Sequence, residues 1–75
     1  MSKRELLEFL AENREADANE IAAAFGVSYS VAAMGLLRLV RQGLARRSID
    51  PERGIHWYIL SDRGQARLAY LRDSE

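Results

Sequence analysis

The chain is short and electrically neutral, with 75 residues, 11 basic and 11 acidic side chains, and one histidine. It contains no cysteine, which excludes disulfides, thiolate metal sites and thiol catalysis. A chain of this length has room for one hydrophobic core, so we expect residues 1–75 to form a single domain.

The first predicted element is a helix from residue 3 to about Asn13. Ser2 and Glu5 have the spacing of a capping box, in which each side chain bonds to the backbone of the other residue. The apolar side of this helix is predicted to consist of Leu6, Leu7, Phe9 and Leu10. Its other side carries Glu5, Glu8, Glu12 and Glu15. Paired carboxylates can perform acid–base chemistry, but no nucleophile accompanies this stripe, so we interpret it as a solvated face.

A short connection over residues 13–16 leads to a second predicted helix, which Asp17 is expected to cap. Glu20 lies in its first turn, near the positive end of the helix dipole. The inward side is predicted to be Ile21, Ala24 and Phe25. Gly26 should end the helix, and Val27 is placed to fill the following turn with an apolar side chain.

The third predicted helix, over residues 28–42, is the element around which we expect the fold to be organised. Ser28 can cap it, and Gly43 can adopt the positive φ that follows a last turn. Apolar residues recur at helical spacing, at Ala32, Gly35, Leu36, Leu39 and Val40. Two short helices joined by a tight turn form a helix-turn-helix, whose second helix can enter a DNA major groove.

After Gly43 the composition changes to that of strands. Residues 44–49 and 55–60 are predicted to pair as a β-hairpin, because the second segment is rich in aromatic and β-branched residues. The sequence Asp-Pro-Glu-Arg-Gly over residues 50–54 is typical of the turn between them, with Gly54 at positive φ.

The last predicted element is a helix from about Asp62 to Arg72, which Ser61 begins and which turns Leu68 and Leu71 inward. The residues after it, 73–75, are expected to fray.

This order of elements is that of a winged helix-turn-helix, an α+β fold that is mainly helical, with three helices, a β-hairpin wing and a C-terminal helix. The sequence resembles the small bacterial and archaeal transcriptional regulators of the MarR and PadR type over roughly residues 5–68. Residues 26–28, followed by Leu39 and Gly43, look like the family's turn and recognition helix. Residues 58–64 are similar to the tyrosine, leucine, Ser/Thr and glycine pattern that leads from the wing into the next helix.

The resemblance implies a DNA-binding regulator that binds double-stranded DNA as a homodimer. With Ala32, Leu36 and Leu39 inward, the side chains expected to face DNA from the third helix are Ser28, Tyr29, Ser30, Ala33 and Met34. Phosphate contacts are expected from Arg38 and Arg41, and backbone or minor-groove contacts from the wing residues Arg46, Arg47 and Arg53. His56 adds a titratable group at the hairpin, which we interpret as a half-exposed strand residue.

The charges are unevenly distributed along the neutral chain. Residues 1–20 hold three basic and six acidic side chains, whereas residues 21–47 hold four arginines and no acidic residue. Residues 48–75 are nearly balanced. The sequence therefore predicts a basic surface on the third helix and the hairpin that suits an anionic partner.

A protein-interaction winged helix is the alternative. Residues 29–34 include none of the Arg, Lys, Asn or Gln side chains that read bases best, and Val31, Met34 and Leu37 could instead form a protein-binding patch. The chain also resembles the small accessory protein of bacterial ferrous-iron transport, although the cysteines often found in that protein's wing are absent here.

Strand alternation adds an expectation about assembly. The family pattern turns Tyr58 and Leu60 inward, which leaves Ile55, Trp57 and Ile59 on the outer side of the hairpin. Such a surface should be covered, either by the last helix or by a second subunit.

No catalytic constellation, metal-ligand spacing or phosphate-binding loop is recognisable, so we predict neither an enzyme nor a cofactor. The longest apolar run, residues 31–37, is far below the roughly 20 residues of a membrane helix. We therefore expect a cytoplasmic protein, and no small-molecule effector is evident.

Overall fold

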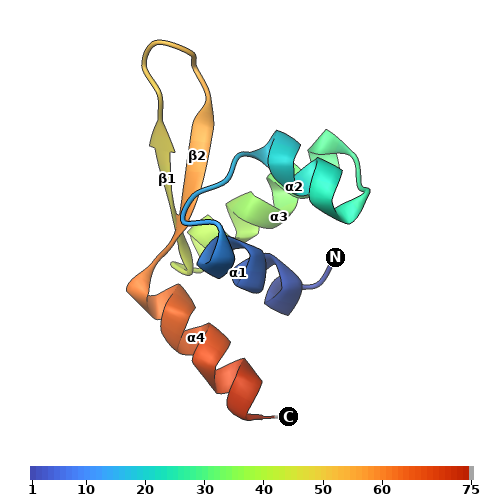
Figure 1. The fold of residues 1–75 in the computed structure, drawn as a ribbon. Helices are drawn as coiled ribbons and strands as arrows, with labels where there is room; N and C mark the ends of the chain where they lie inside the picture. Colours follow the sequence, from blue (N-terminus) through green and yellow to red (C-terminus); the bar gives the residue numbers. More distant parts are fainter. Residues whose placement is uncertain (75) are drawn as a thin grey trace.

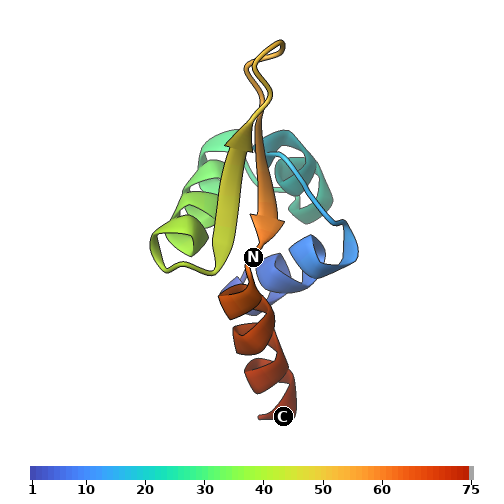
Figure 2. The same ribbon diagram turned by 90° about the vertical axis from the view of Figure 1, so that its left-hand side faces the viewer.

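The computed structural model describes residues 1–74. The elements, in chain order, are α1 (Lys3–Glu12), α2 (Ala18–Phe25), α3 (Tyr29–Arg41), β1 (Ala45–Ile49), β2 (His56–Leu60) and α4 (Asp62–Asp73). The β-hairpin rises from one end of a body made by the first three helices, and α4 extends from the opposite end (Figure 1). Viewed from the side, the hairpin stands between α3 and the pair formed by α1 and α2 (Figure 2). The predicted winged helix-turn-helix fold is confirmed.

Helix α1 begins with the predicted capping box. The Ser2 N–H donates to Glu5 Oε1 over 2.9 Å, and the Glu5 N–H donates to Ser2 Oγ over 3.1 Å. The bond from the Ser2 backbone, and after it the Ser2 side chain, holds the pKa of the Glu5 carboxyl below its ordinary value of 4.5. Glu8 is not part of a fully solvated stripe, because it is half-buried and pairs with Arg4 over 3.1 Å and with Arg72 over 3.7 Å.

Helices α2 and α3 form the helix-turn-helix. The Glu20 N–H donates to Asp17 Oδ1 over 2.8 Å, which confirms the predicted cap, and Gly26 ends α2 in the left-handed conformation at φ 64°. Among residues 1–74, no single helix is long and apolar enough to cross a membrane, and α2 and α3 meet that requirement only as a pair bent by 116°. An angle of 116° lies in the range of helix-turn-helix motifs.

The inward face of α2 differs from the prediction at one position. Ala24 is exposed, whereas Ala18 is buried and Ala22 is half-buried against the core. Together with Ile21 and Phe25, these residues follow an i, i+3, i+4, i+7 spacing. The assignment of Ala24 was wrong because neighbouring alanines in this helix offer almost no contrast in hydrophobicity.

The core lies where α1, α2, α3 and the base of the hairpin meet. Its largest fully buried side chains are Leu7, Leu10, Ile21, Leu36, Leu39 and Leu44. The rings of Phe9 and Phe25 pack against each other with their centroids 5.7 Å apart and their planes tilted by 56°, and this contact stabilises the packing of α1 on α2. Each fully buried Leu or Ile stabilises the fold by about 1.5–3 kcal/mol, and this burial holds the helix-turn-helix in place.

The hairpin has two different faces. Strands β1 and β2 pair antiparallel with Arg47 opposite Tyr58 and Arg46 opposite Ile59. The inner face consists of Ala45, Arg47, Ile49, His56, Tyr58 and Leu60. The outer face consists of Arg46, Ser48, Trp57 and Ile59. As predicted, Tyr58 lies on the buried side at 4% exposure, whereas Ile59 is 38% exposed.

The connection between α1 and α2 contains a third extended segment that the sequence did not predict. Ala16 forms an isolated antiparallel bridge with Tyr58 in the middle of β2, so β2 pairs with β1 along one edge and with Ala16 along the other.

Ser61 joins helix α4 to the hairpin. The Ser61 Oγ accepts from the Gly64 N–H over 3.0 Å and donates to the Gly43 carbonyl over 2.7 Å. Gly64 lies so close to the Leu44 carbonyl that a Cβ atom there would collide with it. The helix continues one residue beyond the predicted end, to Asp73, and Ser74 caps it, so the expected fraying is wrong for Asp73. Glu75 lies outside the described residues.

Candidate nucleic-acid interface

The outer side of α3 forms a continuous exposed face. Ala32, Leu36 and Leu39 are buried as predicted, which turns the opposite side of the helix to solvent. Along that side, Ser30, Met34 and Arg38 follow one another at four-residue spacing, and all three are exposed. This row is the part of the predicted site that the fold brings together most clearly.

Three of the predicted base-facing residues of α3 are less free than the sequence implies. The Ser28 hydroxyl accepts from the Val31 N–H over 3.2 Å and therefore acts as the helix cap. Ala33 is half-buried and packs against the core. Leu37, which the alternative interpretation placed in an exposed patch, is also half-buried. Tyr29 is 59% exposed but lies on a different side of α3 from the row of Ser30, Met34 and Arg38.

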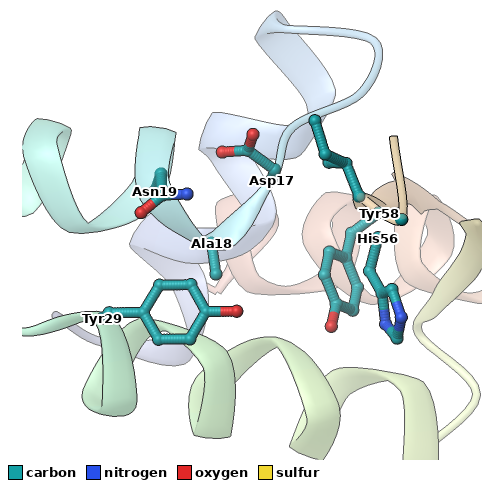
Figure 3. A pocket seen from close by; sticks show the side chains of 8 residues that line it. Asp17, Ala18, Asn19, Tyr29, His56 and Tyr58 are labelled. Carbon is teal, nitrogen blue, oxygen red and sulfur yellow. The ribbon is translucent and has the colours of Figure 1, made fainter. Parts of the chain in front are cut away.

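Tyr29 belongs to a cleft between the helix-turn-helix and the wing. The cleft has a volume of about 290 Å³ and is lined by residues of α2, α3 and the hairpin, among them Asp17, Asn19, Tyr29, His56 and Tyr58. In Figure 3 the Tyr29 hydroxyl points across the cleft toward the side chains of Tyr58 and His56. The inner face of the hairpin, which also carries Arg47, therefore looks toward the beginning of α3.

Arg38 and Arg41 lie in the last turn of α3 and are both exposed. Two cations at this position stabilise the negative end of the helix dipole by roughly 0.3–1 kcal/mol each, so part of their role is structural. Arg38 also borders a groove of about 230 Å³ between α3 and the start of α1, lined in part by Met1, Leu6 and Val31.

The wing arginines do not share one face. Because Arg46 and Arg47 are neighbours in a strand, they project to opposite sides of the hairpin, Arg46 opposite Ile59 and Arg47 opposite Tyr58. Arg53 is exposed in the turn at the tip. The basic surface predicted from the charge distribution is therefore divided, with Arg47 on the side of the cleft and Arg46 on the outer side.

The acidic residues of α1 do not neutralise this surface. Glu8 binds Arg4 and Arg72, and within residues 1–74 no arginine of α3 or of the hairpin forms an ion pair with an α1 glutamate. In the same part of the chain no group of three or more His, Asp and Glu side chains is arranged to hold a metal ion.

This combination of helix-turn-helix, exposed recognition-helix face and arginine-bearing wing defines a winged helix-turn-helix domain. No protein-family model and no curated protein matches the chain. Among solved structures, a MarR family transcription regulator shares 30% identity with a TM-score of 0.85, over 96% of this chain and 48% of that one. A MarR family transcriptional regulator from Silicibacter pomeroyi shares 28% identity with a TM-score of 0.83, over 95% of this chain and 48% of that one.

This chain covers a larger share of a third solved structure. A possible transcriptional regulator for arsenical resistance shares 32% identity with a TM-score of 0.75, over 95% of this chain and 71% of that one. The chain belongs to the MarR-like winged-helix transcriptional regulators. It spans about half the length of the first two structures.

Proposed function

We propose that this chain binds double-stranded DNA as a transcriptional regulator, with α3 in the major groove and the β1–β2 hairpin as the wing. The observation that carries the proposal is the charge of the segment over residues 21–49, which holds most of the helix-turn-helix and all of β1. Residues 21–49 hold four arginines and no acidic residue, and all four side chains are exposed. Arg38 and Arg41 at the end of α3 and Arg47 on the cleft side of the hairpin place basic groups beside the free helix face, which suits the phosphates that border a major groove.

In this arrangement the two halves of α3 have different tasks. A major groove about 12 Å wide admits a helix, and the residues early in the recognition helix approach the base edges. Ser30 and Met34 would then face bases, while Arg38 and Arg41 would lie near phosphates. Arg47 and Arg53 would follow the backbone or enter the adjacent minor groove from the wing.

We further propose that the regulator is a homodimer of single-domain, cytoplasmic subunits. A surface that suits a second copy runs along α1, the end of β2 and α4, where two adjoining hollows of about 680 and 270 Å³ share Ala11, Leu60 and Gln65. Ile59 borders this surface and is 38% exposed. A symmetric dimer through this surface could place two recognition helices about 34 Å apart, one helical turn of DNA.

DNA binding is tested by fluorescence anisotropy with a labelled mixed-sequence duplex of roughly 20 base pairs, which is long enough for two half-sites. We expect binding at about 50 mM salt that weakens steeply at about 200 mM. Arg38→Glu should weaken binding about tenfold at the lower salt, because one phosphate contact becomes a repulsion. Arg67→Glu makes the same charge change on the exposed side of α4 and is the matched control. Absence of binding at the lower salt would refute the proposal.

Dimerisation is tested separately by sedimentation equilibrium. Ile59→Glu places a charge on the proposed interface and should produce monomers, whereas Ile49→Glu makes the same change on the inner face near the wing tip and should leave the dimer intact. A wild-type chain that stays monomeric at high protein concentration would contradict the homodimer without affecting DNA binding by a single subunit.

A protein-interaction module is the second candidate, and one observation favours it. Tyr29, Val31 and Met34 are 59%, 50% and 55% exposed on α3. Apolar side chains gathered on one helix can also bind a protein groove. Capture of a protein partner that Arg38→Glu leaves unchanged, together with no duplex binding, would favour this candidate. Neither candidate involves catalysis, and the structures to which the chain is similar are transcription regulators.

A further inference from the structure

The recognition helix lacks the side chains that read bases by paired hydrogen bonds. From Tyr29 to Leu37, α3 contains no Arg, Lys, Asn, Gln, Asp or Glu. Bidentate contacts to guanine and adenine depend on guanidinium, ammonium or amide groups, so these nine residues cannot form them. If this face meets bases, its selectivity must come from another chemical group.

The side chain that projects from the middle of this face is a methionine. Met34 is 55% exposed and lies in the same row as Ser30 and Arg38. Tyr29 is turned aside into the cleft with the wing (Figure 3). Ala33 is half-buried, so neither residue competes with Met34 for the centre of the groove. An unbranched thioether chain adapts its shape to small apolar surfaces.

The major groove offers one apolar group, the C5-methyl of thymine, whereas the other base edges present only hydrogen-bond donors and acceptors. Met34 placed against those polar edges would strip them of water without replacing the lost hydrogen bonds, which is unfavourable. Against a thymine methyl it would bury apolar surface at no such cost. Arg38, one turn later in the row, would hold the helix in place by its charge.

We propose that α3 selects DNA by contact between Met34 and C5-methyl groups in the major groove, so that the preferred duplexes are rich in thymine at the contacted positions. The inference rests on the DNA binding proposed above and adds the group that is read. It is independent of the wing, because removal of a C5-methyl leaves the minor-groove edge of the base pair unchanged.

The test compares duplexes that differ only in methyl groups. Affinity is measured for an alternating A·T duplex and its deoxyuridine counterpart, and for an alternating G·C duplex with cytosine or 5-methylcytosine. We expect each contacted methyl to strengthen binding about fourfold, the change that corresponds to burial of one methyl-sized group. The increase in affinity when cytosine is replaced by 5-methylcytosine should match the decrease when thymine is replaced by deoxyuridine, because both methyl groups lie on the same edge of the major groove.

Three variants assign the effect to a residue. Met34→Ala should abolish the methyl dependence and Met34→Leu, which remains apolar and of similar size, should retain it. Arg38→Ala should weaken binding to all duplexes by a common factor and leave the methyl dependence unchanged. Equal affinities with and without methyl groups would overturn this inference and leave DNA binding standing. Failure to bind any of these duplexes would overturn DNA binding and the inference together.

Discussion

Ala16 and Tyr58 exchange two backbone hydrogen bonds, from the Ala16 N–H to the Tyr58 carbonyl over 3.0 Å and from the Tyr58 N–H to the Ala16 carbonyl over 2.8 Å. Ala16 lies between α1 and α2, so the bridge ties the helical body to the middle of β2. The Tyr58 side chain is itself 4% exposed. Backbone and side chain of one residue therefore fix the position of the wing relative to the helix-turn-helix.

We expect Tyr58→Ala to lower the free energy of unfolding by about 3–5 kcal/mol, because truncation of a buried aromatic residue leaves a cavity. For a 75-residue chain this is a large part of the total stability, at roughly 0.05–0.15 kcal/mol per residue. Trp57, the residue before Tyr58, lies on the outer face and is half-buried, so Trp57→Ala should lower the free energy of unfolding clearly less. Urea unfolding followed by circular dichroism measures both, and equal losses would show that Tyr58 does not anchor the wing.

The two helical glycines should respond to alanine in opposite ways. Alanine is favoured over glycine in a helix by about 1 kcal/mol, so helix propensity alone predicts stabilisation at both sites. At Gly64 the new Cβ would collide with the Leu44 carbonyl, and we expect Gly64→Ala to destabilise the fold by about 1–3 kcal/mol. At Gly35 it would meet only the Met1 and Leu6 side-chain ends, at 3.0 and 3.3 Å, which can move, so Gly35→Ala should be neutral or stabilising. Thermal unfolding of the two variants gives the sign, and a stabilised Gly64→Ala would contradict the close packing of α4 on the hairpin.

Ser28 has a structural role that can be separated from contact with DNA. Ser28→Ala removes the bond to the Val31 N–H and should cost about 0.5–2 kcal/mol of stability. Ser28→Asp keeps a capping oxygen and should unfold like the wild type. Its negative charge at the start of α3 should nevertheless weaken duplex binding, as anisotropy at low salt would measure. Unchanged binding by Ser28→Asp would place the beginning of α3 away from the phosphates.

The elements of this fold were predictable from sequence wherever their cause is local. Caps at Ser2, Asp17 and Ser61 each depend on residues three positions apart, and the positive φ of Gly26 depends on its lack of a side chain. The Ala16 bridge was missed because its partner lies on a distant strand and a single extended residue has no periodicity. The direction of Tyr29 was likewise not predictable, since the cleft that it enters forms only when the wing packs beside α2.

The opposite directions of the two arginines in β1 follow from the sequence, although we predicted a single basic surface from the charge distribution. Strand alternation requires Arg46 and Arg47 to project to opposite faces, whereas the charge distribution alone groups them together. Which of the two faces approaches DNA depends on the placement of the hairpin against α3, and that is a property of the whole fold.

Arg46 and Arg47 therefore form a matched pair for the proposed DNA contact. Arg47 shares the inner face with Tyr58 and His56, which line the cleft beside the beginning of α3. Arg46 lies opposite Ile59, which borders the surface that we propose for the dimer.

We expect Arg47→Ala to weaken duplex binding and to reduce the slope of log affinity against log salt by about 1, the contribution of one phosphate contact. Arg46→Ala removes the same charge from the neighbouring residue and should change the slope much less. Because both residues are exposed, neither substitution should alter the unfolding transition. The reverse order of effects in a salt titration would mean that the outer face of the hairpin meets the duplex, and the dimer would then have to use a different surface.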